Sequence, residues 1–283
     1  MAKRTCEYCN HEFQPYLGLC PHCARPGLYP NVHAAEEVTE CEALENHYKQ
    51  ALDAAELRGA KADVARFEKR AEETKAVIAR SIDETMRLAT SDGDLYPTFE
   101  QRFHSGMTLL ECDKWYGPRI AAGAILFPGY AEHIRMGALS LNGLGLSRYG
   151  ECSIVMREEL IAHRSSVFRE NSALFVERHG VKEGAVPPGH RATWQSRSKL
   201  CVAKHAEQIT PAVKDEAFAD ILLKDGPSGE EDVFIEVHIH GPMTRRTFER
   251  VIVRAPKRWQ TRVIIKALRE KLAQAGVPLE VRQ

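Results

Sequence analysis

The sequence predicts a protein of the α+β class in three parts: a cysteine-rich module at residues 1–28, a helical segment at 29–94 and a mixed domain at 95–283. Three observations support this division. Four cysteines form two close pairs near the N-terminus, apolar residues then recur every three or four positions, and short β-type runs later alternate with amphipathic stretches.

The cysteine-rich module has the spacing Cys-x2-Cys-x10-Cys-x2-Cys, formed by Cys6, Cys9, Cys20 and Cys23. Each pair can make a tight turn, and four thiolates suit one tetrahedral zinc ion with Zn–S distances of about 2.3 Å. Few apolar residues lie between the pairs, so such a ribbon needs its metal to fold. The pattern therefore predicts a structural zinc site, with two disulfides or unpaired thiols as the alternative.

The remaining four cysteines are scattered singly along the chain. This usage is typical of a reducing compartment, so we expect a cytoplasmic protein. The first residues show no apolar core of a signal peptide, and no apolar run approaches the ~20 residues that span a bilayer. We therefore expect no membrane partner.

The segment 29–94 reads as long helix. Two apolar stripes with helical spacing run from Val38 to Leu52 and from Val64 to Met86, and Gly59 lies between them. Glycine is unfavourable inside a helix, which favours an antiparallel hairpin that turns near Gly59 over a single continuous helix. Such a hairpin would serve as an arm, a brace or an element through which the chain forms an oligomer.

The mixed domain contains alternating candidates for strands and helices. Strands are expected at 99–106, 135–141, 152–156, 232–240 and 251–254. Helices are expected at 109–124, 157–162, 193–208, 211–222 and 258–275, and a loop at 180–189.

The expected strand at 232–240 carries the strongest chemical signal. Side chains alternate along a strand, so Glu236, His238 and His240 share one face while apolar residues occupy the other. One interpretation is the polar wall of a cleft, and the other is a half-exposed edge strand. The two histidines with the carboxylate also resemble a metal-binding strand.

Three other segments are weaker candidates for a site. His104, Ser105 and Gly106 end an expected strand, where the glycine lets a ligand approach the backbone. The glycine-rich stretch 142–150, which includes Tyr149, is either a phosphate-binding loop or a plain hairpin turn. The polar stretch 162–172 connects two apolar strands and could line a site.

Charge is unevenly distributed in a chain whose formal net charge is zero. Residues 34–94 contain 9 Lys and Arg against 15 Asp and Glu, whereas residues 242–283 contain 11 against 3. The basic C-terminal segment indicates either an anionic partner such as nucleic acid or an ordinary solvated helix face. Its candidate phosphate contacts are Arg245, Arg246, Lys257, Arg258 and Arg262.

Taken together, these pieces resemble the ADP-ribosyltransferase fold, and within it the DarT-type branch that modifies nucleic acid. The resemblance covers roughly residues 99–272. It depends on the order of five segments: 103–106 with the helix after it, 134–139, 153–160 with the polar stretch 163–172, 236–239, and 248–253.

The resemblance implies a split β core with flanking helices and NAD as the substrate. It implies that Glu236, which opens a late strand, is the catalytic carboxylate. Arg135 and Arg119 compete for the role of the catalytic arginine. It further implies that NAD contacts come from His104, Ser105, Gly106, Arg119 and Tyr149. The acceptor would be nucleic acid, and the enzyme would be a toxin or phage-defence effector controlled by an antitoxin or regulatory protein.

Two rival functions remain open at this point. One is a zinc-ribbon adaptor that binds nucleic acid or protein without catalysis. The other is a metal-dependent hydrolase that uses Glu236, His238 and His240.

Overall fold

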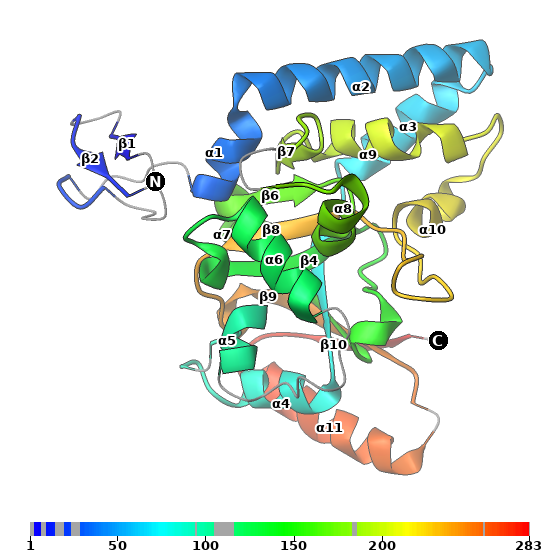
Figure 1. Ribbon diagram of the computed structural model, residues 1–283. Helices are drawn as coiled ribbons and strands as arrows, with labels where there is room; N and C mark the ends of the chain where they lie inside the picture. The colour runs from blue at the N-terminus through cyan, green and yellow to red at the C-terminus, as the bar shows by residue number, and fades with distance from the viewer. Residues whose placement is uncertain are drawn as a thin grey trace.

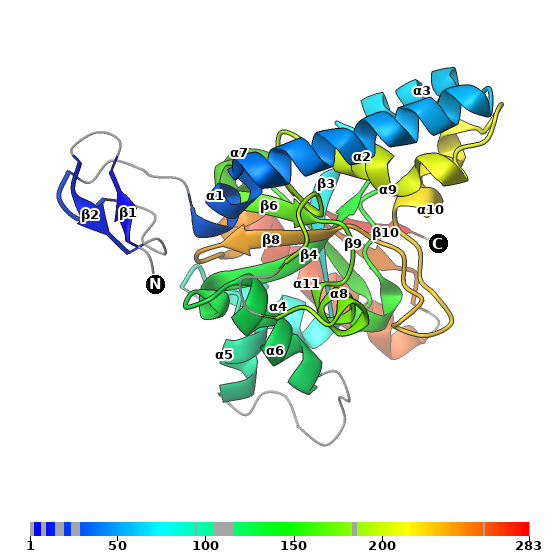
Figure 2. The same ribbon diagram turned by 45° about the horizontal axis from the view of Figure 1, so that its top comes forward.

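The computed structural model describes residues 3–6, 10–14, 20–23, 29–93, 95–104, 116–182, 186–256 and 258–282. Within these residues the chain is of the α+β class, as the sequence predicts, with one large mixed sheet and helices packed on it (Figure 1). A small antiparallel pair, β1 (Arg4–Thr5) and β2 (Glu12–Phe13), belongs to the cysteine-rich module and lies beside this body (Figures 1 and 2).

Eight strands of the described residues pair in the order β10-β9-β5-β3-β4-β8-β6-β7, and among these pairs only β9 and β10 run parallel. The strands are β3 (Lys75–Arg80), β4 (Ile134–Ser140), β5 (Cys152–Met156), β6 (Ser165–Phe168), β7 (Arg191–Thr193), β8 (Glu236–His240), β9 (Phe248–Arg254) and β10 (Leu279–Arg282).

The two faces of the sheet are covered differently. The larger hydrophobic core lies on one face, where the apolar side chains of β8 and its neighbours meet helices from both halves of the chain. Those helices are α2 (Val38–Leu57), α3 (Lys61–Ala71), α4 (Ile82–Thr90), α9 (Arg197–His205), α10 (Phe218–Leu222) and α11 (Trp259–Gln274).

On the other face, α6 (Tyr116–Leu126) and α8 (Ser172–His179) lie side by side over β4, β6 and β8 (Figure 2). The loop 141–150 covers β3, β5 and β9 through Leu144, which packs on Val77, Val155 and Ile252. This face is therefore covered in two parts, a pair of helices and a loop.

The expected hairpin is confirmed, and its turn is at Gly59, whose φ of +71° is a conformation that glycine adopts without strain. The prediction that helix continues through the second stripe is wrong after Ala71, because 75–80 is β3, in the middle of the sheet. The stripe is broken by Ser81, whose Oγ accepts a hydrogen bond from the backbone N–H of Glu84 and starts α4.

The strand expected at 99–106 is also wrong within the described residues, since Phe99–His104 forms the helix α5. Thr98 and Gln101 explain the difference. The Thr98 N–H donates to Gln101 Oε1 at 3.0 Å, and the Gln101 N–H donates to Thr98 Oγ1 at 3.2 Å. This reciprocal pair is a capping box, which fixes a helix start.

The strand expected at 152–156 is confirmed with the same ends, and those expected at 135–141, 232–240 and 251–254 are confirmed with shifted ends, as is the closing helix. The helix expected from 193 begins only at Arg197, because Thr193 ends β7. The helix expected at 211–222 is reduced to a short 3-10 turn and α10, and the helical turn expected at 157–162 is present as α7 (Glu158–Ile161). Strands β6 and β10 were not expected.

The hairpin is a brace of the main body, which Phe67→Ala should demonstrate. Phe67 is fully buried and stacks edge-on against Phe218 at 5.2 Å between ring centroids. Its truncation should lower the free energy of unfolding by about 3–5 kcal/mol in denaturant titrations.

Leu57→Ala is the matched control, because Leu57 lies on the same hairpin and is 90% exposed. Its effect should stay within about 0.5 kcal/mol. If Phe67→Ala left the main unfolding transition unchanged, the hairpin would be an independent arm.

Candidate functional site

A pocket of about 330 Å³ opens where β3 and β4 part. Strand β3 pairs with β4 at residues 75–77 and with β5 at residues 77–80. Four consecutive residues of each strand, 77–80 and 135–138, line the pocket. Because neighbouring side chains of a strand point to opposite faces, a pocket on one face would not contact four in a row. The pocket therefore lies between the two strand edges.

Four residues that the sequence predicts as site residues line this pocket: Arg119, Arg135, Tyr149 and Glu236. Ser105 and Gly106 lie outside the described residues, and His104 ends α5 instead of a strand. The pocket also receives the two polar residues that end the stretch 162–172, Asn171 and Ser172.

The carboxylate of Glu236 is fixed by two donors. Its Oε2 accepts from the backbone N–H of Ser172 at 3.0 Å and lies 3.0 Å from Nε2 of His238. Ser172 is the first residue of α8, whose N-terminal end carries a partial positive charge. Within the described part of the chain both donors contact Oε2, which leaves Oε1 available to a ligand.

His238 orients this carboxylate from the same face of β8. The imidazole is 3% exposed and stands edge-on to Phe127, with ring centroids 4.7 Å apart. The ring of Phe168 lies on another side at 5.8 Å. These aromatic rings hold the imidazole in place and shield it from solvent. His238 therefore keeps the carboxylate of Glu236 in one orientation.

Arg135 is buried in the edge of β4. Its Nε donates to the carbonyl of Tyr96 at 3.1 Å, and its Nη1 donates to the carbonyl of His133 at 3.0 Å. Burial lowers the pKa of Arg135 to about 10, so the group stays charged at neutral pH. Arg135 pairs with Ile239 and Glu236 with Ala138, so the two side chains leave opposite faces of the β4–β8 pair.

Arg119 and Tyr149 face each other across the loop side of the pocket. The guanidinium carbon of Arg119 lies 5.9 Å from the Tyr149 ring centroid. Burial raises the pKa of Tyr149, although Arg119 opposes the shift. The tyrosine therefore stays a neutral hydroxyl at physiological pH.

Three more arginines line the pocket: Arg80, Arg102 and Arg148. Arg102 and Arg148 lie in or beside candidate segments of the sequence without being predicted as site residues, and Arg80 lies outside them. Arg80 and Arg102 both form ion pairs with Glu84, and Arg80 lies 4.8 Å from the Tyr96 ring centroid. The signal for Arg80 was its place directly before the helix-capping Ser81, which marks a strand end.

The third arginine, Arg148, is held by a bidentate pair with Asp232 at 2.7 and 3.0 Å, which raises its pKa. Including Arg119 and Arg135, five guanidinium groups line the described part of the pocket. Glu84 and Asp232 pair with arginines of the pocket, and Glu236 lines the pocket with them, so the pocket carries charges of both signs.

The glycine-rich stretch is not a simple hairpin turn, because β3 lies between the two strands that it connects. It bends back over the sheet, and Gly145, Leu146, Arg148 and Tyr149 line the pocket. The N–H of Gly145 donates to Ser153 Oγ at 2.9 Å, so this amide is already satisfied within the protein. The loop therefore contributes mainly side chains to the pocket, whereas a phosphate-binding loop would offer a ring of free backbone N–H groups.

The metal-binding interpretation of β8 does not fit the geometry. Among the described residues, only one group of three or more metal-ligating atoms lies within 4.8 Å, and it excludes β8. His238 is paired with Glu236, whereas His240 lies among aromatic rings, 5.1 Å from Tyr29 and 5.7 Å from His133. Glu236 and His240 are four residues apart on one strand, about 13 Å along it, so they do not converge on one ion.

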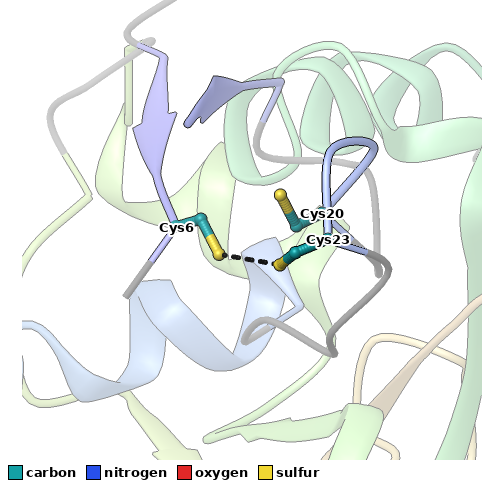
Figure 3. A group of neighbouring side chains, drawn as sticks. All are labelled: Cys6, Cys20 and Cys23. Atoms are coloured by element: carbon teal, nitrogen blue, oxygen red, sulfur yellow. Dashed lines mark hydrogen bonds between the residues drawn. The ribbon is translucent and has the colours of Figure 1, made fainter. Parts of the chain in front are cut away.

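The one group that does converge is Cys6, Cys20 and Cys23, shown in Figure 3. The sulfurs of Cys6 and Cys23 are 3.6 Å apart, too far for a disulfide and close to the ~3.8 Å that tetrahedral Zn–S bonds of 2.3 Å require. These three residues fit a metal site. Cys9, the fourth predicted ligand, lies outside the described residues.

Comparison with protein-family models and with curated proteins finds no match for this chain, so its function must be inferred from the site itself. Among the described residues, no helix combines the length and the apolar character that crossing a membrane requires.

Zinc content tests the cysteine site directly. Protein purified without chelator and with reduced thiols should contain about one zinc per chain by elemental analysis. Cys20→Ser should lose this metal, and the unfolding transition of the α+β body should stay in place. Cys41→Ser, which changes an exposed cysteine of α2, should keep the metal. Absence of zinc from the wild-type protein would exclude the site.

His240 should make stability depend on pH. Burial, with the charges of His133, Arg164 and Arg135 adding to it, lowers the pKa of His240 to about 4. Within the described residues neither ring nitrogen has a hydrogen-bond partner. The unfolded chain takes up a proton near pH 6.5 and the folded chain only near pH 4, so stability that is complete above pH 6.5 is lost as pH falls.

The effect is about 2 kcal/mol between pH 7 and pH 5. His240→Phe keeps a buried ring without a titrating group, so its free energy of unfolding should fall by that much less over the same range. Zinc loss in acid affects both proteins alike. Equal pH slopes for the two proteins would contradict this account.

Proposed function

We propose that this protein is an NAD-dependent ADP-ribosyltransferase with nucleic acid as its acceptor. The observation that carries the proposal is the fixed carboxylate of Glu236 in a pocket whose lining includes five arginines. A dinucleotide needs cationic groups for its two phosphates and one anionic group at the reacting ribose, and this pocket offers both.

The charge of the pocket supports the choice of NAD. Its volume of about 330 Å³ lies at the lower end of the range of small-molecule sites, so it would enclose only part of a dinucleotide. Guanidinium groups pair with phosphate oxygens through two parallel hydrogen bonds. Arg80 on β3 and Arg119 on α6 are the candidates, because both side chains line the pocket. Arg135 donates two of its nitrogens to carbonyls, whereas Arg80 donates Nη1 to the carbonyl of Ala79 at 2.8 Å.

The separation of β3 from β4 also supports an ADP-ribosyltransferase. The resemblance noted in the sequence implies a split β core, and β3 leaves β4 after Val77. Strand β3 lies outside the residues that carry the resemblance, and the first of their segments forms the helix α5 instead of a strand. The expected catalytic glutamate opens β8, beside the resulting pocket.

The reaction would begin with loss of nicotinamide, which takes the electron pair of the bond between its nitrogen and the ribose. Positive charge then develops on the ribose ring. Glu236 Oε1 would accept a hydrogen bond from a ribose hydroxyl and stabilise this charge, while Ser172 and His238 keep Oε2 in place. The acceptor attacks the anomeric carbon, and the carboxylate can take the proton that the acceptor releases.

A pair of variants tests the proposal. Glu236→Gln keeps the shape of the side chain and removes its charge, so it should still bind NAD but release nicotinamide at least ~100-fold more slowly. Arg80→Ala should instead weaken NAD binding. Binding is measured by calorimetry and nicotinamide release by chromatography, with single-stranded oligonucleotides as acceptors.

Glu177→Gln is the matched control, because Glu177 is an exposed carboxylate on α8. It should change neither quantity. Full activity of Glu236→Gln would remove the glutamate from the mechanism. A wild-type protein that neither binds NAD nor releases nicotinamide would favour the rival function, a zinc-containing adaptor without catalysis.

A further inference from the structure

The solvent-facing side of α11 exposes large apolar residues, although its other side packs in the core. Ile265, Leu268 and Leu272 are buried in the core. On the solvent side Trp259 is 68% exposed and Val263 is 56% exposed. These two residues are four positions apart, so they form one apolar patch at the start of the helix.

Cationic side chains follow this patch along the helix. Arg258, Arg262, Lys266 and Arg269 are exposed, and within the described part of the chain none of them forms an ion pair. The situation differs for Arg245 and Arg246, which both pair with Asp92, at 2.6 and 3.4 Å. Of the phosphate contacts expected from the sequence, Arg245 and Arg246 are thus paired, Lys257 lies outside the described residues, and Arg258 and Arg262 belong to the unpaired set on α11. Lys266 and Arg269 are additions from the structure.

A groove of about 340 Å³ runs beside these cations, between α11 and the outermost strand β10. Arg262, Lys266 and Arg269 line it together with Ile265 and Val281, and its described lining contains no carboxylate. The three cations occupy about 10 Å of helix, a length over which a stacked strand presents about three phosphates.

We propose that this groove and the adjoining Trp259 form a docking surface for single-stranded nucleic acid. The cations of the groove contact consecutive phosphates, and Trp259 stacks on an unpaired base, which an acidic peptide does not offer. A duplex is a poorer partner, because its bases are already stacked. The binding stands independently of catalysis, whereas a role in presenting the acceptor rests on the proposed transferase function.

The surface lies far from the hairpin. In Figure 1, α11 and α2 lie at opposite ends of the body, and α11 packs against α4. The surface includes none of the residues assigned to the pocket between β3 and β4. Variants of the surface should therefore change nucleic-acid binding without changing NAD binding.

The test uses the full chain and a fluorescently labelled 20-nucleotide oligo(dT), with oligo(U) of equal length to compare DNA with RNA. Trp259→Ala should weaken binding about 10-fold, and Trp259→Phe, which keeps a stacking ring, should recover most of it. Lys266→Ala should reduce the slope of log K against log salt by about 0.7 between 50 and 200 mM.

Arg246→Ala removes an equal charge from the same segment but one already paired with Asp92, so it should leave the salt slope unchanged. Equal effects of Arg246→Ala and Lys266→Ala would overturn the proposal, because binding would then depend on net charge alone. Tighter binding of a polyglutamate peptide or of the matching duplex would overturn it as well.

The outcome is separable from the test of catalysis. Glu236→Gln should bind the oligonucleotide as the wild type does. If the oligonucleotide binds as expected and no nicotinamide is released by the wild type, only the transferase proposal fails. If nicotinamide is released and Trp259→Ala binds like the wild type, only the docking surface fails.

Discussion

The separation of β3 from β4 after Val77 is the constraint on which the rest of this structure depends. Up to Val77 the two strands pair normally, and beyond it β3 continues beside β5 alone. Two strand edges are thereby left apart inside a sheet that is otherwise continuous. Gly137 on β4 belongs to this arrangement, since a Cβ there would lie 2.9 Å from the carbonyl oxygen of Val77. Any larger residue would push the strands apart where they still need to pair.

The opening explains why polar groups can lie within a sheet at all. Buried charges are unfavourable unless they are paired or hydrogen-bonded, and the two buried charged groups Arg135 and Glu236 have such partners. Arg135 donates to two backbone carbonyls, and Glu236 accepts from the start of α8 and from His238. The helix α1 (Pro30–Glu36) supports the same strand, because Asn31 Nδ2 donates to the carbonyl of His238 at 3.0 Å.

Much of this could be predicted from alternation and helical spacing, because those patterns record burial on one face. The apolar face of 235–239 predicted β8 and its polar face, and Gly59 predicted the turn of the hairpin. Two boundaries that the apolar spacing does not show depend on local contacts, because Ser81 and Thr98 start helices through side-chain hydrogen bonds. The spacing on both sides of Arg80 predicts helix, so Arg80 is not found as a site residue on β3. The pairing of β3 with two neighbours depends on residues far apart in the chain, which periodicity does not record.

The positive charges of the chain lie in two different environments, the pocket between β3 and β4 and the surface of α11. In the pocket, five guanidinium groups are balanced in part by three carboxylates, so a small anion would be held by directed hydrogen bonds in a partly buried site. On α11 the cations have no such partners among the described residues and lie in solvent. Interactions there are weakened by salt, whereas those in the pocket are screened much less. In the two proposals, a chain with zero formal net charge would therefore hold a small anion firmly at one place and exchange a long anionic polymer at another, because the two surfaces differ in burial.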